Sequence, residues 1–86
     1  MIKIWAKLYI DNKIVRQYVY EKEGKFSYGN FLTYLIDICY EFDIATPVLL
    51  KTHLFNYGKF NFTKFLKRDF VEVFEYDNLV LENIFV

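Results

Sequence analysis

Hydrophobic and polar residues alternate at the start of the chain, which is the pattern of a β-strand with one buried face. Every second position of 2–10 is apolar: Ile2, Ile4, Ala6, Leu8 and Ile10. The Asp11-Asn12 pair that follows suits a two-residue turn, because Asp and Asn tolerate positive φ. We therefore predict a hairpin in which 13–21 returns antiparallel to 2–10.

The two-residue turn also predicts the register of this hairpin. Leu8 then faces Val15 and Ile4 faces Val19, which gives the hairpin an apolar face. The opposite face pairs Trp5 with Tyr18, Tyr9 with Ile14 and Lys7 with Arg16. A register error of one residue would exchange the two faces of one strand.

Helical spacing replaces alternation after the polar, Gly-containing break at 21–25. Phe31, Leu35, Ile38 and Phe42 recur three or four residues apart, which predicts a helix capped by Ser27 and running to about Phe42. Thr46-Pro47 is a start signal for a second helix. We expect this helix to reach Tyr57 and to end at Gly58 in a left-handed conformation.

The last part of the chain has the spacing of short strands. We predict an extended segment over 60–65, a turn at 67–69, a strand over 70–75, a turn at 76–78 and a strand over 79–84. The predicted order is ββααββ. It defines a single two-layer α+β domain over 1–86, in which two helices lie on one face of an antiparallel sheet.

Composition limits the class of protein. Eight Tyr, ten Phe and one Trp among 86 residues supply large side chains for a small core. No apolar run reaches the length of a membrane-spanning helix, and the charged N-terminus is unlike a signal peptide. Cys39 is the only cysteine, so an intrachain disulfide is excluded, and its apolar surroundings predict a buried thiol. We expect a cytoplasmic protein without membrane association.

Charge is balanced overall but segregated along the chain. The five basic residues of 51–68 have no acidic residue among them, and the five acidic residues of 69–86 have no basic one. One interpretation is that the two blocks lie close together and cancel. The other is that they face different partners.

Four stretches, DIATPVLLKTH, FNFTKF, DFVE and YDNLVLE, resemble a small uncharacterised family of bacterial proteins of the low-GC Gram-positive type. The resemblance covers most of the chain. It implies a small bacterial cytoplasmic protein of unknown function, and it carries over no catalytic or binding residue.

The sequence offers few residues for catalysis or metal binding. One His and one Cys cannot supply a zinc site, and the glycines at 24, 29 and 58 form no phosphate-binding loop. A Cys39–His53 catalytic pair is conceivable, but we expect Cys39 to be inert and His53 to be exposed or a hydrogen-bond partner at the core edge. We therefore expect no metal, no cofactor and no enzymatic activity.

Two surfaces remain as candidates for binding. The outer face of the hairpin would present Lys3, Trp5, Lys7, Tyr9, Arg16, Tyr18 and Tyr20. Aromatic rings flanked by bases form stacking platforms for single-stranded nucleic acid, although the same face could instead be covered by protein. A basic rim would comprise Lys51, Lys59, Lys64, Lys67 and Arg68.

From these surfaces we expect a small protein-interaction module that self-associates as a homodimer or larger homo-oligomer, or that binds another protein. The alternative is a single-stranded nucleic-acid-binding protein that uses the basic-aromatic sheet face. Weaker alternatives are a helix-turn-helix DNA reader and a small inhibitor encoded on a mobile element.

Overall fold

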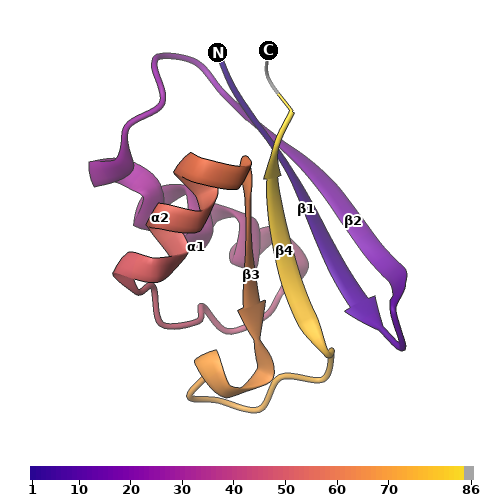
Figure 1. The fold of residues 1–86 in the computed structure, drawn as a ribbon. Helices are drawn as coiled ribbons and strands as arrows, with labels where there is room; N and C mark the ends of the chain where they lie inside the picture. Colours follow the sequence, from indigo (N-terminus) through magenta and orange to yellow (C-terminus); the bar gives the residue numbers. More distant parts are fainter. Residues whose placement is uncertain (85–86) are drawn as a thin grey trace.

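The structure, a computed structural model, describes residues 1–84 and has the predicted α+β class and element order. Four strands form one antiparallel sheet in the order β2-β1-β4-β3. The strands are β1 (Ile2–Ile10), β2 (Lys13–Lys22), β3 (Phe62–Leu66) and β4 (Asn78–Asn83). The helices α1 (Phe31–Phe42) and α2 (Lys51–Phe60) both lie on one face of this sheet (Figure 1).

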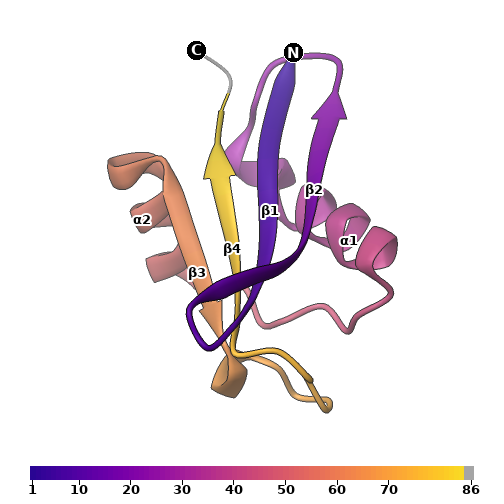
Figure 2. The same cartoon turned by 90° about the vertical axis from the view of Figure 1, so that its right-hand side faces the viewer.

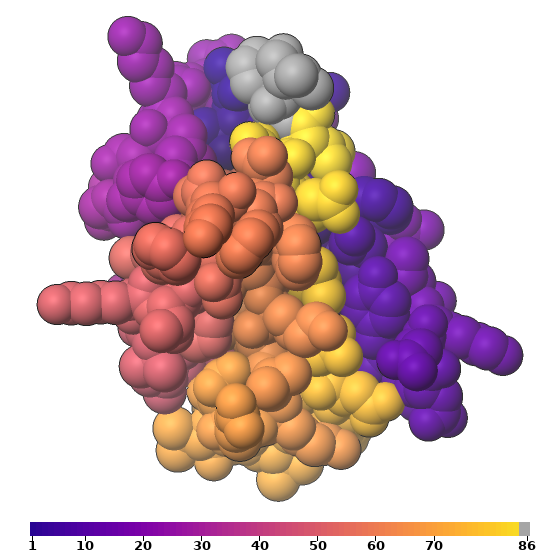
Figure 3. Space-filling model, in the orientation of Figure 1, coloured from indigo at the N-terminus to yellow at the C-terminus, as the bar shows by residue number. Residues whose placement is uncertain are grey.

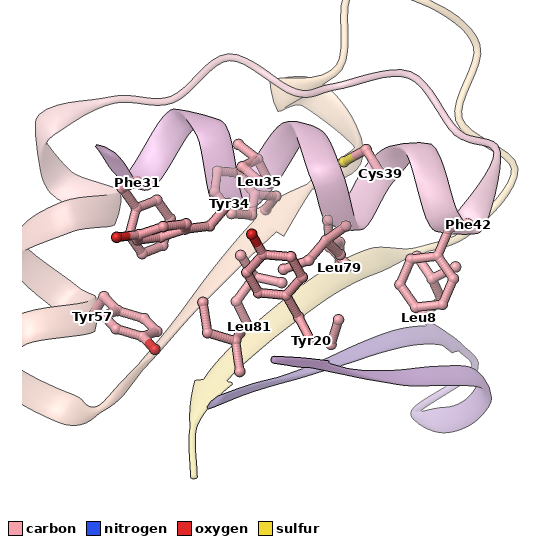
Figure 4. Close-up of a cluster of buried hydrophobic side chains, with 14 of the residues drawn as sticks. Leu8, Tyr20, Phe31, Tyr34, Leu35, Cys39, Phe42, Tyr57, Leu79 and Leu81 are labelled. Atoms are coloured by element: carbon pink, nitrogen blue, oxygen red, sulfur yellow. The ribbon is translucent and has the colours of Figure 1, made fainter. Parts of the chain in front are cut away.

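The core lies between the sheet and the helices. Apolar residues of β1 and β4 and the inner stripe of α1 meet there, and Figure 4 shows these side chains pointing toward one another. Ile4, Ala6 and Leu8 have no exposed surface, which confirms the predicted alternation of 2–10. Asp11 and Asn12 both have positive φ, at 52° and 63°, as the predicted two-residue turn requires.

The predicted hairpin register is wrong beyond the turn. Tyr9 does lie opposite Ile14, but the register shifts between Leu8 and Tyr9, and from there Leu8 pairs with Arg16 and Ile4 with Tyr20. Val15 is the extra residue of this β-bulge, which inserts one residue into β2. Because side chains alternate along a strand, the shift exchanges the two faces of β2 over 16–22.

The strand predicted over 70–75 is also wrong, because the partner of β4 is β3. Phe70 and Phe74 instead stack against each other, with ring centroids 3.7 Å apart, and both are buried. Val71 and Val73 project outward and are 89% and 91% exposed. Two aromatic rings spaced four residues apart therefore fold this segment into a loop against the core.

Both predicted helices begin later than their sequence signals. Tyr28–Asn30 forms a 3₁₀ turn ahead of α1, and Ser27 makes no capping hydrogen bond. The second helix begins at Lys51, where His53 Nδ1 accepts a hydrogen bond of 2.9 Å from the Leu50 amide. That bond takes the place of the expected Thr46 cap.

The end of α2 lies beyond Gly58, contrary to the prediction. Gly58 is inside the helix, where an added Cβ would lie 2.6 Å from the Tyr28 hydroxyl. Asn61, with φ of 63°, is the left-handed residue that closes the helix. Among residues 1–84, neither helix has the length and apolar character needed to cross a bilayer.

Candidate protein-interaction surface

The face of the sheet opposite the helices carries no described helix. In Figure 2 the end of the β1–β2 hairpin crosses in front of β4 and β3, and its turn residue Asn12 lines a depression there with Phe62 and Lys64. The register places side chains of all four strands in rows across this open face. One row runs from Val19 through Trp5 and Glu82 to Phe62, and the next from Gln17 through Lys7 and Val80 to Lys64. We call this surface the open face.

The predicted binding face is divided between the two sides of the sheet. Lys3, Trp5, Lys7 and Tyr9 alternate with the buried residues of β1 and lie on the open face. The register shift moves Arg16, Tyr18 and Tyr20 to the helix side. The like-charge pair of Lys7 and Arg16 therefore does not form, and Lys7 lies opposite Gln17.

The contacts of these three β2 residues with α1 confirm their position. The Tyr20 hydroxyl donates a 2.6 Å hydrogen bond to Asp37. The pKa of Tyr20 is raised, mainly because the phenol is buried and secondly because of the Asp37 carboxylate. Tyr18 packs edge-on against Phe42, and the Arg16 guanidinium donates to the Phe42 carbonyl at 2.9 Å. Arg16 therefore satisfies a carbonyl at the C-terminus of α1 instead of facing a ligand on the open face.

Lys7 is buried although its position faces away from the helices. Its ammonium group lies 2.7 Å from Glu82 Oε1 and 4.0 Å from the centre of the Trp5 ring. The Trp5 indole in turn donates a 3.0 Å hydrogen bond to Gln17. The positive charge of Lys7 is thus neutralised within the protein, and the centre of the open face has little net charge.

A shallow depression of about 290 Å³ lies beside Lys7 on the open face, lined by Lys7, Tyr9, Asn12, Phe62, Lys64, Asn78, Val80 and Glu82. The Asn78 side-chain oxygen is buried without a hydrogen-bond partner. The depression contains one neutralised cation and one exposed cation, Lys64. It has the character of a contact surface for a neutral, partly apolar group.

The free margin of the sheet is β2, which pairs only with β1 among the described strands. The direction of its backbone groups follows from β1. Lys3 accepts a hydrogen bond from the Ile84 amide on the β4 side, so the odd-numbered residues of β1 point toward β4 and the even-numbered ones toward β2. Tyr18 and Tyr20, the partners of Ala6 and Ile4, therefore bond to β1, while Gln17, Val19 and Glu21 direct their N–H and C=O groups outward.

Exposed apolar side chains accompany these unpaired backbone groups. Ile14, Val15 and Val19 are 41%, 46% and 44% exposed. The other margin, β3, is half as long and carries Lys64 near its middle. Short length and lysine are common ways to protect a sheet edge from pairing, and so is a bulge, which β2 has at Val15. The regular part of β2 over 16–22 is nevertheless longer than β3, so β2 is the edge that is better suited to accept another strand.

The five residues of the predicted basic rim are all exposed and lie along α2, β3 and the turn after β3. In Figure 3 these elements form one continuous surface beside the stripe of β4. Within residues 1–84 none of the five makes an ion pair. The bases of 51–68 are therefore not neutralised by direct contacts with the acidic residues of 69–84. The Lys59 ammonium instead lies over the Phe55 and Phe60 rings, at 5.6 and 5.5 Å from their centres.

Cys39 and His53 are both buried and have separate partners. Burial raises the pKa of the Cys39 thiol from 9.0 to about 12, with a smaller opposing effect from Thr46. A thiol with this pKa is a poor nucleophile near neutral pH, as the sequence predicted for an inert buried cysteine. His53 is the expected hydrogen-bond partner at the core edge, because Nδ1 accepts from Leu50 and Nε2 lies 3.4 Å from Asp69. No cluster of three potential metal ligands occurs within residues 1–84.

Sequence reasoning missed the residues that define the free edge, namely Gln17, Val19 and Glu21. Their outward direction depends on the bulge at Val15 and on the pairing of β1 with β4. The alternating pattern of β2 is compatible with either face being buried. The only sequence signal for the face that lies toward the helices is the pair Tyr18 and Tyr20, because phenol groups can form hydrogen bonds at the edge of a core.

Comparison with known proteins adds no relative: no family model, no curated protein and no solved structure matches this chain. The resemblance of four stretches to a bacterial family therefore stays a hypothesis. The function has to be argued from the open face and the free edge of β2.

Proposed function

We propose that this protein is a non-enzymatic protein-interaction module that self-associates through the free edge of β2 and the adjoining part of the open face. The observation that carries the proposal is the combination, on one margin of the sheet, of outward-directed backbone groups and exposed Val15 and Val19. Strand addition at a sheet edge supplies backbone hydrogen bonds, and side chains of alternate residues supply specificity.

The near-neutral charge of this region supports a protein partner. Lys7 is paired with Glu82, and Lys3 lies 3.5 Å from Glu21, so two of the bases on the open face already have acidic partners. Charged residues are depleted at the centre of protein interfaces, whereas nucleic-acid surfaces are strongly basic. A centre whose charges are paired with each other, beside exposed valines, fits the first class.

The alternative, a single-stranded nucleic-acid-binding protein, loses support from the division of the predicted face. Tyr18, Tyr20 and Arg16 contact α1 and cannot stack on or neutralise a strand that crosses the open face. Trp5, Tyr9 and Phe62 remain there, with Lys64 as a base that makes no ion pair within residues 1–84. A helix-turn-helix reading also weakens, because 43–50 between the helices is longer than the short turn of that motif.

The proposal predicts concentration-dependent association, which analytical ultracentrifugation measures directly. Val19→Lys places a charge beside the free edge and should shift the protein toward monomer. Val73→Lys is the matched control, because Val73 is 91% exposed on the loop after β3 and the same substitution there leaves β2 unchanged. We expect this control to associate like the unmodified protein.

A strictly monomeric unmodified protein at high concentration would refute the proposal, and so would equal association of the two lysine variants. Titration of Trp5 fluorescence with single-stranded oligonucleotides tests the alternative. We expect no quenching at low salt. Quenching that weakens as salt is added would favour nucleic-acid binding instead.

A further inference from the structure

We infer that two copies of the chain pair antiparallel along β2, with a two-fold axis that passes between the Gln17 residues and runs perpendicular to the sheet. This inference rests on the proposed self-association and adds the partner surface and its register. It follows from three features of the free edge: the direction of its backbone groups, the faces of its side chains and the order of its charges.

Backbone direction limits the registers. Gln17, Val19 and Glu21 direct their N–H and C=O groups away from β1, so hydrogen-bonded pairs across the new contact must join these residues to outward-directed residues of the second copy. A register that joins an outward residue to an inward one would leave backbone groups unpaired and would oppose the open face of one copy to the helix face of the other. Only registers that keep outward-directed residues opposite one another remain, and these differ from each other by an even number of residues.

Side-chain chemistry distinguishes among these even shifts. With Gln17 opposite Gln17, Val15 lies opposite Val19 and Arg16 opposite Tyr18, so apolar residues meet and the guanidinium meets a ring. Beyond the bulge, Lys13 lies opposite Ile10 on the helix side, whereas Glu21 lies beside Lys3 on the open face, so the regular contact ends at Val15. The Val15–Val19 and Arg16–Tyr18 contacts each occur twice, on either side of the single Gln17–Gln17 contact, as a two-fold axis requires.

The neighbouring registers are less favourable. A shift in one direction sets Arg16 against Arg16, and the opposite shift sets Val15 against Glu21. A further shift sets Arg16 against Lys22. Like charges directly opposite one another destabilise a strand pair, and a carboxylate opposite Val15 replaces the apolar contact that Val19 would make there.

This pairing would produce a continuous eight-stranded sheet, because each copy contributes four strands. A two-fold axis perpendicular to the sheet keeps the helices of both copies on the same side. The open faces therefore join into one surface, and Trp5, which is bonded to Gln17, lies close to the axis in both copies. The edge at β2 is then no longer exposed to unrelated strands.

Cysteine cross-linking tests the register. The only native cysteine, Cys39, is 1% exposed, so the unmodified chain provides a background of low reactivity. Residues opposite one another in an antiparallel pair have Cα atoms about 4.5–5.5 Å apart, within the range that a disulfide spans. We therefore expect Gln17→Cys to form a disulfide-linked dimer under mild oxidation, whereas Val19→Cys alone links poorly. A mixture of Val15→Cys and Val19→Cys should give linked heterodimers.

Val73→Cys is the control for chance collision, because its thiol would be highly exposed and far along the chain from β2. We expect the linked fraction of Gln17→Cys to exceed that of Val73→Cys by about tenfold, since pairing raises the effective concentration of the two thiols. Efficient self-linking of Val19→Cys without linking of Gln17→Cys would overturn the register and leave self-association standing. Linking of no variant above the Val73→Cys level, in a protein that sediments as a monomer, would refute both proposals.

Discussion

The ammonium group of Lys7 is enclosed by its neighbours although its strand position faces away from the helices. Only 6% of the residue is exposed, while Glu82, its partner in the ion pair, keeps 39% of its side chain exposed. Removing a charge from water is costly unless the charge is paired. The stability of Lys7 at this position therefore depends on Glu82 and on the Trp5 ring.

Glu82→Gln tests this dependence. The substitution leaves the buried Lys7 charge without its carboxylate, so we expect the free energy of unfolding to fall by about 1–2 kcal/mol. This loss is smaller than for a fully buried pair, because the Glu82 side chain is partly exposed. Chemical denaturation followed by Trp5 fluorescence measures the change. The Lys7→Met, Glu82→Gln double variant should recover most of the loss, since it also removes the unpaired charge.

Glu21→Gln is the matched control for Glu82→Gln. Glu21 and Lys3 are 3.5 Å apart with half-exposed side chains, and exposed ion pairs contribute little to stability. We expect a loss of less than about 0.5 kcal/mol for this control. Equal losses in the two variants would show that the Lys7–Glu82 pair behaves as an ordinary exposed one.

At the scale of single elements, α1 is capped by the residue after Phe42, Asp43, which has φ of 56° in the left-handed region. Glycine adopts this conformation without the strain that a Cβ imposes, and a carboxylate at the C-terminus of a helix is also repelled by the helix dipole. The last turn of α1 contains no basic residue, and Arg16 donates to the Phe42 carbonyl from β2.

Asp43→Gly should therefore stabilise the protein, by about 0.5–1 kcal/mol. Asp43→Ala is the informative comparison, because it removes the charge and retains the Cβ at positive φ. Thermal unfolding should rank Asp43→Gly above Asp43→Ala in melting temperature. Equal melting temperatures would mean that backbone conformation contributes nothing at this site.

Elements with long periodic patterns could be predicted from sequence, and the features set by single residues or distant partners could not. The alternation of 2–10 and the helical stripe of 31–42 predict β1 and α1, because each pattern extends over several turns or strand positions. The bulge at Val15 inserts one residue, and β2 has suitable side chains for either face. The prediction of the candidate face failed for Arg16, Tyr18 and Tyr20 for this reason.

The C-terminal strands show a second limit. Phe70 and Phe74 belong to a segment rich in Phe and Val, but their stacking with each other and burial in the core outweigh its tendency to form a strand. The pairing of β1 with β4 joins residues more than sixty positions apart, and local patterns carry no information on it. That pairing decides which amides of β2 point outward, so the free edge becomes visible only in the structure.

On the scale of the whole molecule, the core is too small to bury every large apolar side chain, and the proposals depend on which of these side chains stay exposed. Large apolar side chains remain exposed on several surfaces, including Leu32, Ile36 and Tyr40 on α1 and Val71 and Val73 on the loop after β3. The β2 margin differs from these surfaces because its apolar side chains accompany unpaired backbone groups. Association there would satisfy both kinds of group at once.

Amide hydrogen exchange at increasing protein concentration measures this association at the atoms concerned. The amides of Tyr18 and Tyr20 should be protected at every concentration, because they bond to β1 within one chain. We predict that the amides of Gln17 and Val19 exchange rapidly in dilute protein and become protected as concentration rises. Rapid exchange of these two amides at every concentration, while Tyr18 and Tyr20 stay protected, would contradict pairing of the chain along β2.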